Sequence, residues 1–300
     1  MTRPGFRWIL RSWLLLLLPA LAAAEPALIL STNDPTTAAI AKNFQEGFGQ
    51  GIAVYQLAGN QSEQQRVGEK LAGAPPNLVV VVGNAAAQLA KRYLPGVPTV
   101  YCAARRPELM GLSGPNVYGV YSEPDPKQQL ESLQNAFPAA KTIGLIYSPK
   151  YSQGHVDQVK KLLGPGRELL AVPVDSIKDV PGALRAVLEQ VQVLWLIGDP
   201  MVITSDSFPY IVLSALQKGV PLFGSDEAMA QGGAAVSLIP DPADVGKQAA
   251  RLAQSLLASK APAAPFSYAQ GQVAVNKKII TLLHLSLPPE FMKQVGRSFD

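Results

Sequence analysis

Short apolar runs alternate with amphipathic stretches from residue 27 onward, and this alternation restricts the fold more than any other feature. The runs are rich in Val, Ile and Leu, as in 77–83 (NLVVVVG), and the stretches between them carry apolar residues at helical spacing, as in 242–260. Apolar strands that alternate with helices are typical of βαβ units, because the strands of a parallel sheet are buried on both faces. The sequence therefore predicts an α/β protein with mostly parallel sheets.

The alternation forms two similar series. The irregular, glycine-containing break near 104–122 separates them, at a place where a lobe should end. We favour two doubly wound parallel-sheet lobes, and one large sheet is the alternative. The expected strands are 27–32, 52–57, 77–83, 97–103, 142–148, 168–174, 191–198, 220–224, 234–239 and 266–275. The expected helices are 35–49, 61–73, 84–93, 126–137, 152–163, 179–190, 206–218 and 242–260.

Residues 1–24 have the pattern of a secretory signal peptide. Three arginines and no acidic residue accompany the start, the apolar run 12–21 follows, and three alanines at 22–24 offer a small-residue cleavage site. A membrane anchor is the alternative, but a spanning helix needs about 20 apolar residues, and this run is shorter. The sequence therefore predicts export to the periplasm through a cleaved signal peptide.

The charge of the chain argues against a nucleic-acid partner. The whole sequence has 26 basic and 22 acidic residues, and removal of the three arginines in 1–24 leaves 23 basic against 22 acidic. The remaining chain has no basic stripe of the kind that binds nucleic acid. Cys102 is the single cysteine, so no intramolecular disulfide forms, and its apolar neighbours predict a buried, inert thiol.

Catalytic motifs give no support for an enzyme. The sequence contains no Walker loop, no HExxH and no Gly-x-Ser-x-Gly elbow. The glycines of 47–51 end a helix and enter a strand, which is the reverse of a dinucleotide site. His155 and His284 lie far apart in the sequence, which is a poor basis for a metal site. We expect no enzyme activity, no cofactor and no metal.

A ligand crevice is expected beyond the carboxyl ends of the strands, as in other open parallel α/β sheets. Gly83 and Asn84 stand between an apolar strand and an alanine-rich helix, where backbone N–H groups attract a carboxylate or another anion. Asn84 is expected to cap this helix, with or without ligand contact. Asp199 and Asp226 each follow a strand, and each either binds a ligand amine or hydroxyl or caps the next turn.

Tyrosines are the aromatic candidates for this crevice. Tyr147 and Tyr151 either stack on a ligand ring or cover the sheet. The complete set of predicted ligand-binding residues is Thr32, Asn84, Ala85, Tyr121, Tyr147, Tyr151, Asp199 and Asp226.

Seven segments, taken in chain order, have the pattern of one known family. They are Gly83–Gln88 (GNAAAQ), Asn116–Val120 (NVYGV), Pro138–Tyr147 (PAAKTIGLIY), Asp199, Phe223–Glu227 (FGSDE), Asp244–Ala250 (DVGKQAA) and Asn276–Pro288. In these segments the chain resembles the ABC-transporter substrate-binding proteins of the tryptophan/tyrosine-binding type, which have the type I periplasmic binding fold. The resemblance covers nearly all of the chain after residue 24.

The resemblance implies a small-molecule ligand, often an amino acid or a related compound, held between two lobes that three hinge strands join. It places a ligand carboxylate near Asn84 and Ala85 and a ligand amine near Asp199 or Asp226. It also implies delivery to an inner-membrane ABC permease; a periplasmic sensory subunit that signals to a membrane sensor is the alternative. We expect a monomer.

The lobes implied by the resemblance are discontinuous in sequence. Lobe 1 comprises 25–118 with about 240–262, and lobe 2 comprises 119–239 with about 263–300. The chain departs from the family pattern at Asn84, where the family has threonine, and at Arg106, where the family has aspartate. It also departs at 148–151 (SPKY), where the family has the turn NPSE, so the carboxylate of that turn is lost. These departures fall at the expected cleft, so the resemblance does not fix an aromatic amino acid as the ligand.

Overall fold

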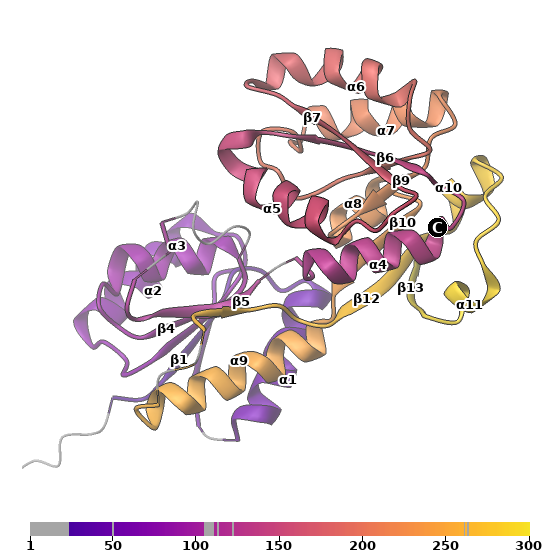
Figure 1. The fold of residues 1–300 in the computed structure, drawn as a ribbon. Coiled ribbons are helices and arrows are strands. Elements are labelled where there is room, and N and C mark those ends of the chain that lie inside the picture. Colours follow the sequence, from indigo (N-terminus) through magenta and orange to yellow (C-terminus); the bar gives the residue numbers. More distant parts are fainter. Residues whose placement is uncertain are drawn as a thin grey trace, which may run out of the picture.

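Two separate β-sheets form the framework of the protein (Figure 1). The computed structural model describes residues 24–49, 51–104, 111–112, 114–121, 123–260, 262 and 264–300, so the predicted signal peptide and Arg106 lie outside the described residues. The first sheet has six strands and the second has seven. The prediction of two mostly parallel lobes is confirmed, and the alternative of one large sheet is wrong.

Lobe 1 is built on the first sheet, in the order β2-β1-β3-β4-β5-β11, with every pair parallel. Its strands are β1 (Ala27–Leu30), β2 (Ala53–Gln56), β3 (Val79–Val82), β4 (Thr99–Ala104), β5 (Val117–Tyr121) and β11 (Phe266–Ser267). Its helices are α1 (Pro35–Phe48), α2 (Gln61–Gly73), α3 (Asn84–Tyr93) and α9 (Pro242–Leu257). Alternate strand residues face opposite sides, so α1 and α9 pack on one face and α2 and α3 on the other.

Lobe 2 repeats this arrangement in the order β7-β6-β8-β9-β10-β12-β13. Its strands are β6 (Thr142–Tyr147), β7 (Glu168–Pro173), β8 (Val193–Trp195), β9 (Leu222–Gly224), β10 (Val236–Pro240), β12 (Gly271–Asn276) and β13 (Val295–Phe299). Its helical segments are α4 (Pro126–Ala136), α5 (Pro149–Leu162), η1 (Ile177–Asp179), α6 (Val180–Leu188), α7 (Ser207–Gln217), α8 (Glu227–Gly232), α10 (Lys277–Leu282) and α11 (Pro289–Met292). Helices α4 and α5 cover one face of the sheet, and α6 and α7 cover the other.

The chain crosses between the lobes three times. The crossings run from β5 to α4, from β10 to α9, and from β11 to β12. The first crossing follows β5 and the third follows β11, because both strands belong to the first sheet. The second crossing lies at Asp241, between β10 and α9.

Asp-Pro pairs start the helices that follow two of these crossings. Asp125 accepts a hydrogen bond from the Lys127 N–H at the start of α4, and Asp241 accepts one from the Ala243 N–H at the start of α9. A side-chain cap satisfies an N–H that has no partner inside the helix, and proline at the first helical position lacks that N–H. The helices therefore begin at once after the chain enters the new lobe.

The C-terminal part of the chain differs most from the sequence prediction. The expected strand 266–275 is two strands, β11 and β12, that pair in different sheets, because Tyr268–Gln270 carry the chain across the hinge. β12 runs antiparallel to β10, the one antiparallel pair within the described part of the chain. The prediction did not include the helices α10 and α11 or the strand β13, which forms the edge of the second sheet beside β12.

Cys102 is fully buried in β4 and forms no disulfide, as expected. Burial raises the pKa of its thiol to about 12, so the group stays protonated and unreactive. None of the helices among the described residues is long and apolar enough to cross a bilayer. In the same residues, His, Cys, Asp and Glu side chains do not gather in a group that would hold a metal ion.

Candidate functional site between the lobes

The order of the strands singles out one place in each sheet. In doubly wound sheets the crevice forms where the strand order reverses, which is the switch point between the first and third strands of each series. In lobe 1 this point lies between β1 and β3, and in lobe 2 it lies between β6 and β8. The predicted residues Thr32, Asn84 and Ala85 follow β1 and β3, and Asp199 follows β8.

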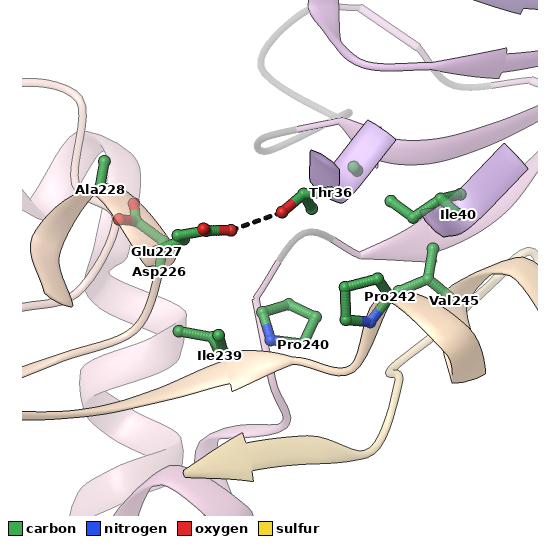
Figure 2. A pocket seen from close by; sticks show the side chains of 10 residues that line it. Thr36, Ile40, Asp226, Glu227, Ala228, Ile239, Pro240, Pro242 and Val245 are labelled. Carbon is green, nitrogen blue, oxygen red and sulfur yellow. Dashed lines mark hydrogen bonds between the residues drawn. The ribbon is translucent and has the colours of Figure 1, made fainter. Parts of the chain in front are cut away.

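A cavity of about 200 Å³ lies between the lobes (Figure 2). Lobe 1 contributes the first turns of α1 and the end of β4, and lobe 2 contributes the start of α8. The second crossing, on both sides of Asp241, forms the remaining wall. The lining residues are Thr36, Ile40, Ala103, Asp226, Glu227, Ala228, Ile239, Pro240, Pro242 and Val245. Asp226 is the one member of the predicted set that lines this cavity.

Glu227 links the two lobes across the cavity. Its Oε2 accepts a hydrogen bond of 2.6 Å from Thr36 Oγ1 in lobe 1, which is drawn as a dashed line in Figure 2. Its Oε1 accepts bonds from Arg297 Nη2 at 2.6 Å and from Gln231 Nε2 at 3.1 Å. The side chain is only 26 % exposed, and charge-assisted hydrogen bonds strengthen where water is excluded. The carboxylate is therefore fixed in position between the lobes.

The start of α3 differs from the expected cap. Gly83, with φ of 85°, is the N-cap, Asn84 is the first helical residue, and no capping side chain belongs to this position. Ser31 Oγ at the end of β1 instead accepts a hydrogen bond of 2.9 Å from the Ala86 N–H. The predicted capping role of Asn84 is wrong, because a hydroxyl from the neighbouring strand satisfies the helix start.

Thr32 and Asp34 shape the turn that follows β1. Thr32 Oγ1 donates a short hydrogen bond to Asp34 Oδ2, and Asp34 caps α1 through the N–H groups of Thr36 and Thr37. Burial alone raises the pKa of Asp34, but the hydrogen bonds from Thr32, Thr37 and Thr36 outweigh it and lower that pKa below its ordinary value. The capping carboxylate is therefore ionised at neutral pH, next to the exposed Thr32 side chain.

Asp199 lies inside lobe 2 and is 0 % exposed. Its Oδ2 accepts hydrogen bonds from the Ser148 N–H at 2.8 Å and from Ser152 Oγ at 2.5 Å. Its Oδ1 accepts bonds from the N–H groups of Met201 and Val202. The carboxylate thus ties the turn after β8 to the start of α5 after β6. A direct bond to a ligand would require one of these four internal bonds to be exchanged.

Asp226 and the predicted tyrosines have different surroundings. Asp226 is partly exposed and caps α8 through the Met229 N–H, at 2.7 Å. Tyr147 is only 6 % exposed, and its hydroxyl donates to Gln153 Oε1. Tyr151 lies half-buried in the first turn of α5, with Lys150 Nζ 5.0 Å from its ring centroid. Ala85, the second residue of α3, is also half-buried.

Tyr121 lies at the hinge between the lobes. It ends β5, and its ring stacks on Tyr268 of the third crossing, with a centroid distance of 4.6 Å. Phe266 of β11 lies 5.2 Å from the same ring. Tyr121 therefore packs two of the three crossings against each other.

The sequence analysis missed the bond that joins the lobes and the arginine that supports it. Thr36 of α1 binds Glu227 of α8 across 191 positions, and Arg297 of β13 binds Glu227 within lobe 2. The segment 223–227 was noted for its similarity to a family motif, which is the one signal that pointed toward Glu227. Nothing local to Thr36 or Arg297 indicates a partner that far along the chain.

Comparison with known proteins identifies the family. A family model described as an ABC transporter substrate binding protein matches residues 40–297, which include the lobe 2 switch point, all three crossings and every residue that lines the cavity except Thr36. The chain belongs to this family. Its members are binding proteins that serve ABC transport, a non-enzymatic class, and they are typically extracytoplasmic. A small-molecule ligand and a membrane transporter as partner fit this family in general.

Solved structures show the same fold over 92 % of the substrate-binding protein. An ABC domain in complex with L-Trp from Streptococcus pneumoniae is 24 % identical, is covered over its full length and gives a TM-score of 0.63. A ligand-free, open substrate binding protein with adhesive properties from Clostridium difficile is 19 % identical, is covered over 99 % of its length and gives a TM-score of 0.70. A conserved domain protein from Vibrio cholerae is 21 % identical, is covered over 99 % of its length and gives a TM-score of 0.62. No curated protein sequence matches significantly.

Proposed function

We propose that this substrate-binding protein captures an amino acid or a related small molecule between its lobes in the periplasm and delivers it to an inner-membrane ABC permease. The observation that carries the proposal is the cavity between the lobes, whose opposite walls are linked by Thr36 and Glu227. Its volume of about 200 Å³ is below the roughly 300–1,000 Å³ that is common for drug-sized ligands, so a small ligand fits the site best.

We infer that opposite lobes bind the two ends of an amino acid. The start of α3, with Asn84 and Ala85, does not line the cavity, but after lobe closure its helix N–H groups and dipole would attract the ligand carboxylate. On the opposite side, Asp226 and Glu227 offer carboxylates to an amine, and the ligand amine would compete with the Thr36 hydroxyl for Glu227. The L-Trp complex of the Streptococcus pneumoniae protein supports an amino acid as the class of ligand.

Other predicted residues enter the proposal in two groups. Thr32 follows β1 and Tyr151 lies in the first turn of α5 after β6, and both would contact the ligand under this proposal. Asp199 and Tyr147 hold the lobe 2 turns in position through the chain's own hydrogen bonds, and Tyr121 packs the hinge. Lobe closure around the ligand would bring the first group into contact with it.

A thermal-shift screen with amino acids and related metabolites tests the proposal. A ligand at a hundredfold excess over its Kd stabilises the folded protein by about 2.7 kcal/mol. We expect at least one amino acid to raise the melting temperature in a saturable way. The Asp226→Asn variant should lose this effect. The control variant Asp157→Asn, which changes an exposed carboxylate on α5, should retain it. A complete screen without any shift would overturn the proposal.

Export is tested separately. Expression of the full chain in a Gram-negative host, followed by N-terminal sequencing of the periplasmic fraction, is expected to give a mature protein that begins at Glu25. A protein that retains Met1, or that stays in the cytoplasm, would contradict a cleaved signal peptide at 1–24 without affecting the ligand site.

A further inference from the structure

A second, larger cavity of about 510 Å³ lies on lobe 2 beside the hinge. Its walls come from α4, β10, β12 and β13, which lie together in Figure 1, and from the second and third crossings. It shares no lining residue with the cavity between the lobes. At the second crossing, Asp241 lines this second cavity, and its neighbours Pro240 and Pro242 line the cavity between the lobes. The lining residues are Gln128, Glu131, Ser132, Asn135, Leu238, Asp241, Gln270, Gly271, Gln272, Val273, Gln294 and Gly296.

Carboxamides dominate the polar lining. Five side chains carry an amide, namely Gln128, Asn135, Gln270, Gln272 and Gln294. Glu131 and Asp241 add two carboxylates, and no Lys or Arg is among the lining residues that the structure describes. An amide both donates and accepts hydrogen bonds, as does a hydroxyl group, whereas an amine only donates and an anion only accepts. This lining therefore matches an uncharged ligand with many hydroxyl groups and disfavours an anion.

Ser132 gives an independent indication of a ligand. The residue lies on the inner side of α4, is only 8 % exposed and lines the cavity. Its hydroxyl has no hydrogen-bond partner among the residues that the structure describes. A buried polar group without a partner is unfavourable, by about 1–3 kcal/mol, and such groups are rare in native proteins. A ligand hydroxyl in the cavity would supply the missing partner.

The walls of the cavity are held in place by specific packing. Gln128 Oε1 accepts a hydrogen bond of 3.0 Å from the Gly271 N–H, which ties α4 to the start of β12. The amide of Gln272 lies against Gly296, where an added Cβ would come within 2.6 Å of Gln272 Nε2. Glycine at 296 therefore makes room for the Gln272 side chain at the cavity wall.

We propose that this cavity is a second binding site, separate from the cleft between the lobes, for a small uncharged polyol such as a monosaccharide. The amides of Gln272 and Asn135 and the hydroxyl of Ser132 bind its hydroxyl groups, and Glu131 and Asp241 accept further hydrogen bonds from them. The site touches two crossings, so an occupant contacts both lobe 2 and the hinge.

Isothermal titration of the mature protein with D-glucose, D-ribose and sorbitol, each alone, tests the proposal. We expect saturable binding of at least one, weakened about fivefold or more in Ser132→Ala and in Gln272→Leu, since a lost hydrogen bond is worth about 1 kcal/mol. Ser132→Ala is expected to melt no lower than the unsubstituted protein, because its hydroxyl has no internal partner. A weaker affinity in that variant therefore does not come from unfolding.

Two further measurements separate this site from the cleft. Glu227→Gln changes the cleft and is expected to leave polyol binding unchanged, whereas binding lost in Glu227→Gln and kept in Ser132→Ala would overturn the proposal. Spermidine and citrate serve as cationic and anionic probes. Absence of polyol binding would also overturn the proposed site. Binding of spermidine or citrate that is lost in Ser132→Ala would overturn the proposed ligand class.

Discussion

The two switch points are built on the same strand order but are closed by different groups. In lobe 1 a single hydroxyl, Ser31 Oγ, bridges β1 to the start of α3 through the Ala86 N–H. In lobe 2 the carboxylate of Asp199 bridges β8 to the start of α5 and accepts four hydrogen bonds while fully buried. A hydroxyl therefore holds the helix start in lobe 1, and a buried carboxylate holds the corresponding helix start in lobe 2.

This difference explains where ligand contacts are expected. A buried carboxylate with four internal partners fixes the turns around it, whereas a hydroxyl that accepts one hydrogen bond constrains the start of α3 less. On lobe 2, Asp226 and Glu227 at the start of α8 reach the cavity instead of Asp199. Under the proposed function, lobe 1 would offer the N–H groups of α3 to the ligand, and lobe 2 would offer the carboxylates of Asp226 and Glu227.

Asp199→Ala would break the lobe 2 side of this comparison and have the largest effect. The substitution leaves the donors of Ser148, Ser152 and Met201 without their acceptor, and we expect a loss of about 3–5 kcal/mol in the free energy of unfolding. Urea denaturation measures it. Asp157→Ala, at an exposed position on α5, is the control. A variant as stable as the unsubstituted protein, with ligand binding lost, would show that Asp199 contacts the ligand directly.

Gly83→Ala would test the lobe 1 side, with a smaller effect. At φ of 85° an alanine is strained, and its Cβ would lie 2.8 Å from Ser31 Oγ, so we expect a loss of about 1–3 kcal/mol by thermal melting. Gly166→Ala is the matched control, because it has a similar φ of 84° with open space around the Cβ. Equal losses in the two variants would mean that the Ser31 contact contributes nothing.

Thr36→Val would break the bond between the lobes while keeping the shape of the side chain. One hydrogen bond to a carboxylate is lost, and we expect ligand affinity to fall about fivefold, or about 1 kcal/mol. Stability without ligand is expected to change by less than about 0.5 kcal/mol, since the residue lies at the lobe surface. Unchanged affinity in titration calorimetry would show that the Thr36–Glu227 bond plays no part in closure.

Cys102 gives a prediction of no effect. The buried thiol has a pKa of about 12, so iodoacetamide at pH 8 is expected to leave the native protein unmodified, with or without ligand. The thiol reacts only after unfolding in guanidinium, as mass spectrometry would show. Modification of the native protein would mean that the lobe 1 sheet opens far more readily than its packing indicates.

Helices could be predicted well where their signals are local. The expected bounds 61–73 and 84–93 agree with α2 and α3, because the apolar spacing lies within each segment and Asn60, directly before the first segment, caps α2. The segment 266–275 was expected to form one strand. Its division between two sheets depends on where the lobes lie, which no local pattern records.

The candidate site shows the same limit. The strand-end rule gave Asp226, which lines the cavity between the lobes, because strand ends can be read from apolar runs. The ligand contacts predicted for Thr32 and Asn84 stay predictions. It could not tell that Asp199 is buried under Ser148 and Ser152, since their contact spans about fifty positions of the chain. The contact of Glu227 with Thr36 is longer in range and depends on how the two lobes meet.

The central claim is that the two lobes close around a ligand. Spin labels at Gln88→Cys on α3 and Gln158→Cys on α5 would measure the distance between the lobes by pulsed electron resonance, since both positions are exposed and the buried Cys102 stays unlabelled. Addition of the ligand found in the thermal screen is expected to shorten the mean distance between the labels and to narrow its distribution. Without ligand, the Thr36→Val variant is expected to show a longer mean distance. A ligand that binds in the cleft and leaves the distribution unchanged would contradict the claim.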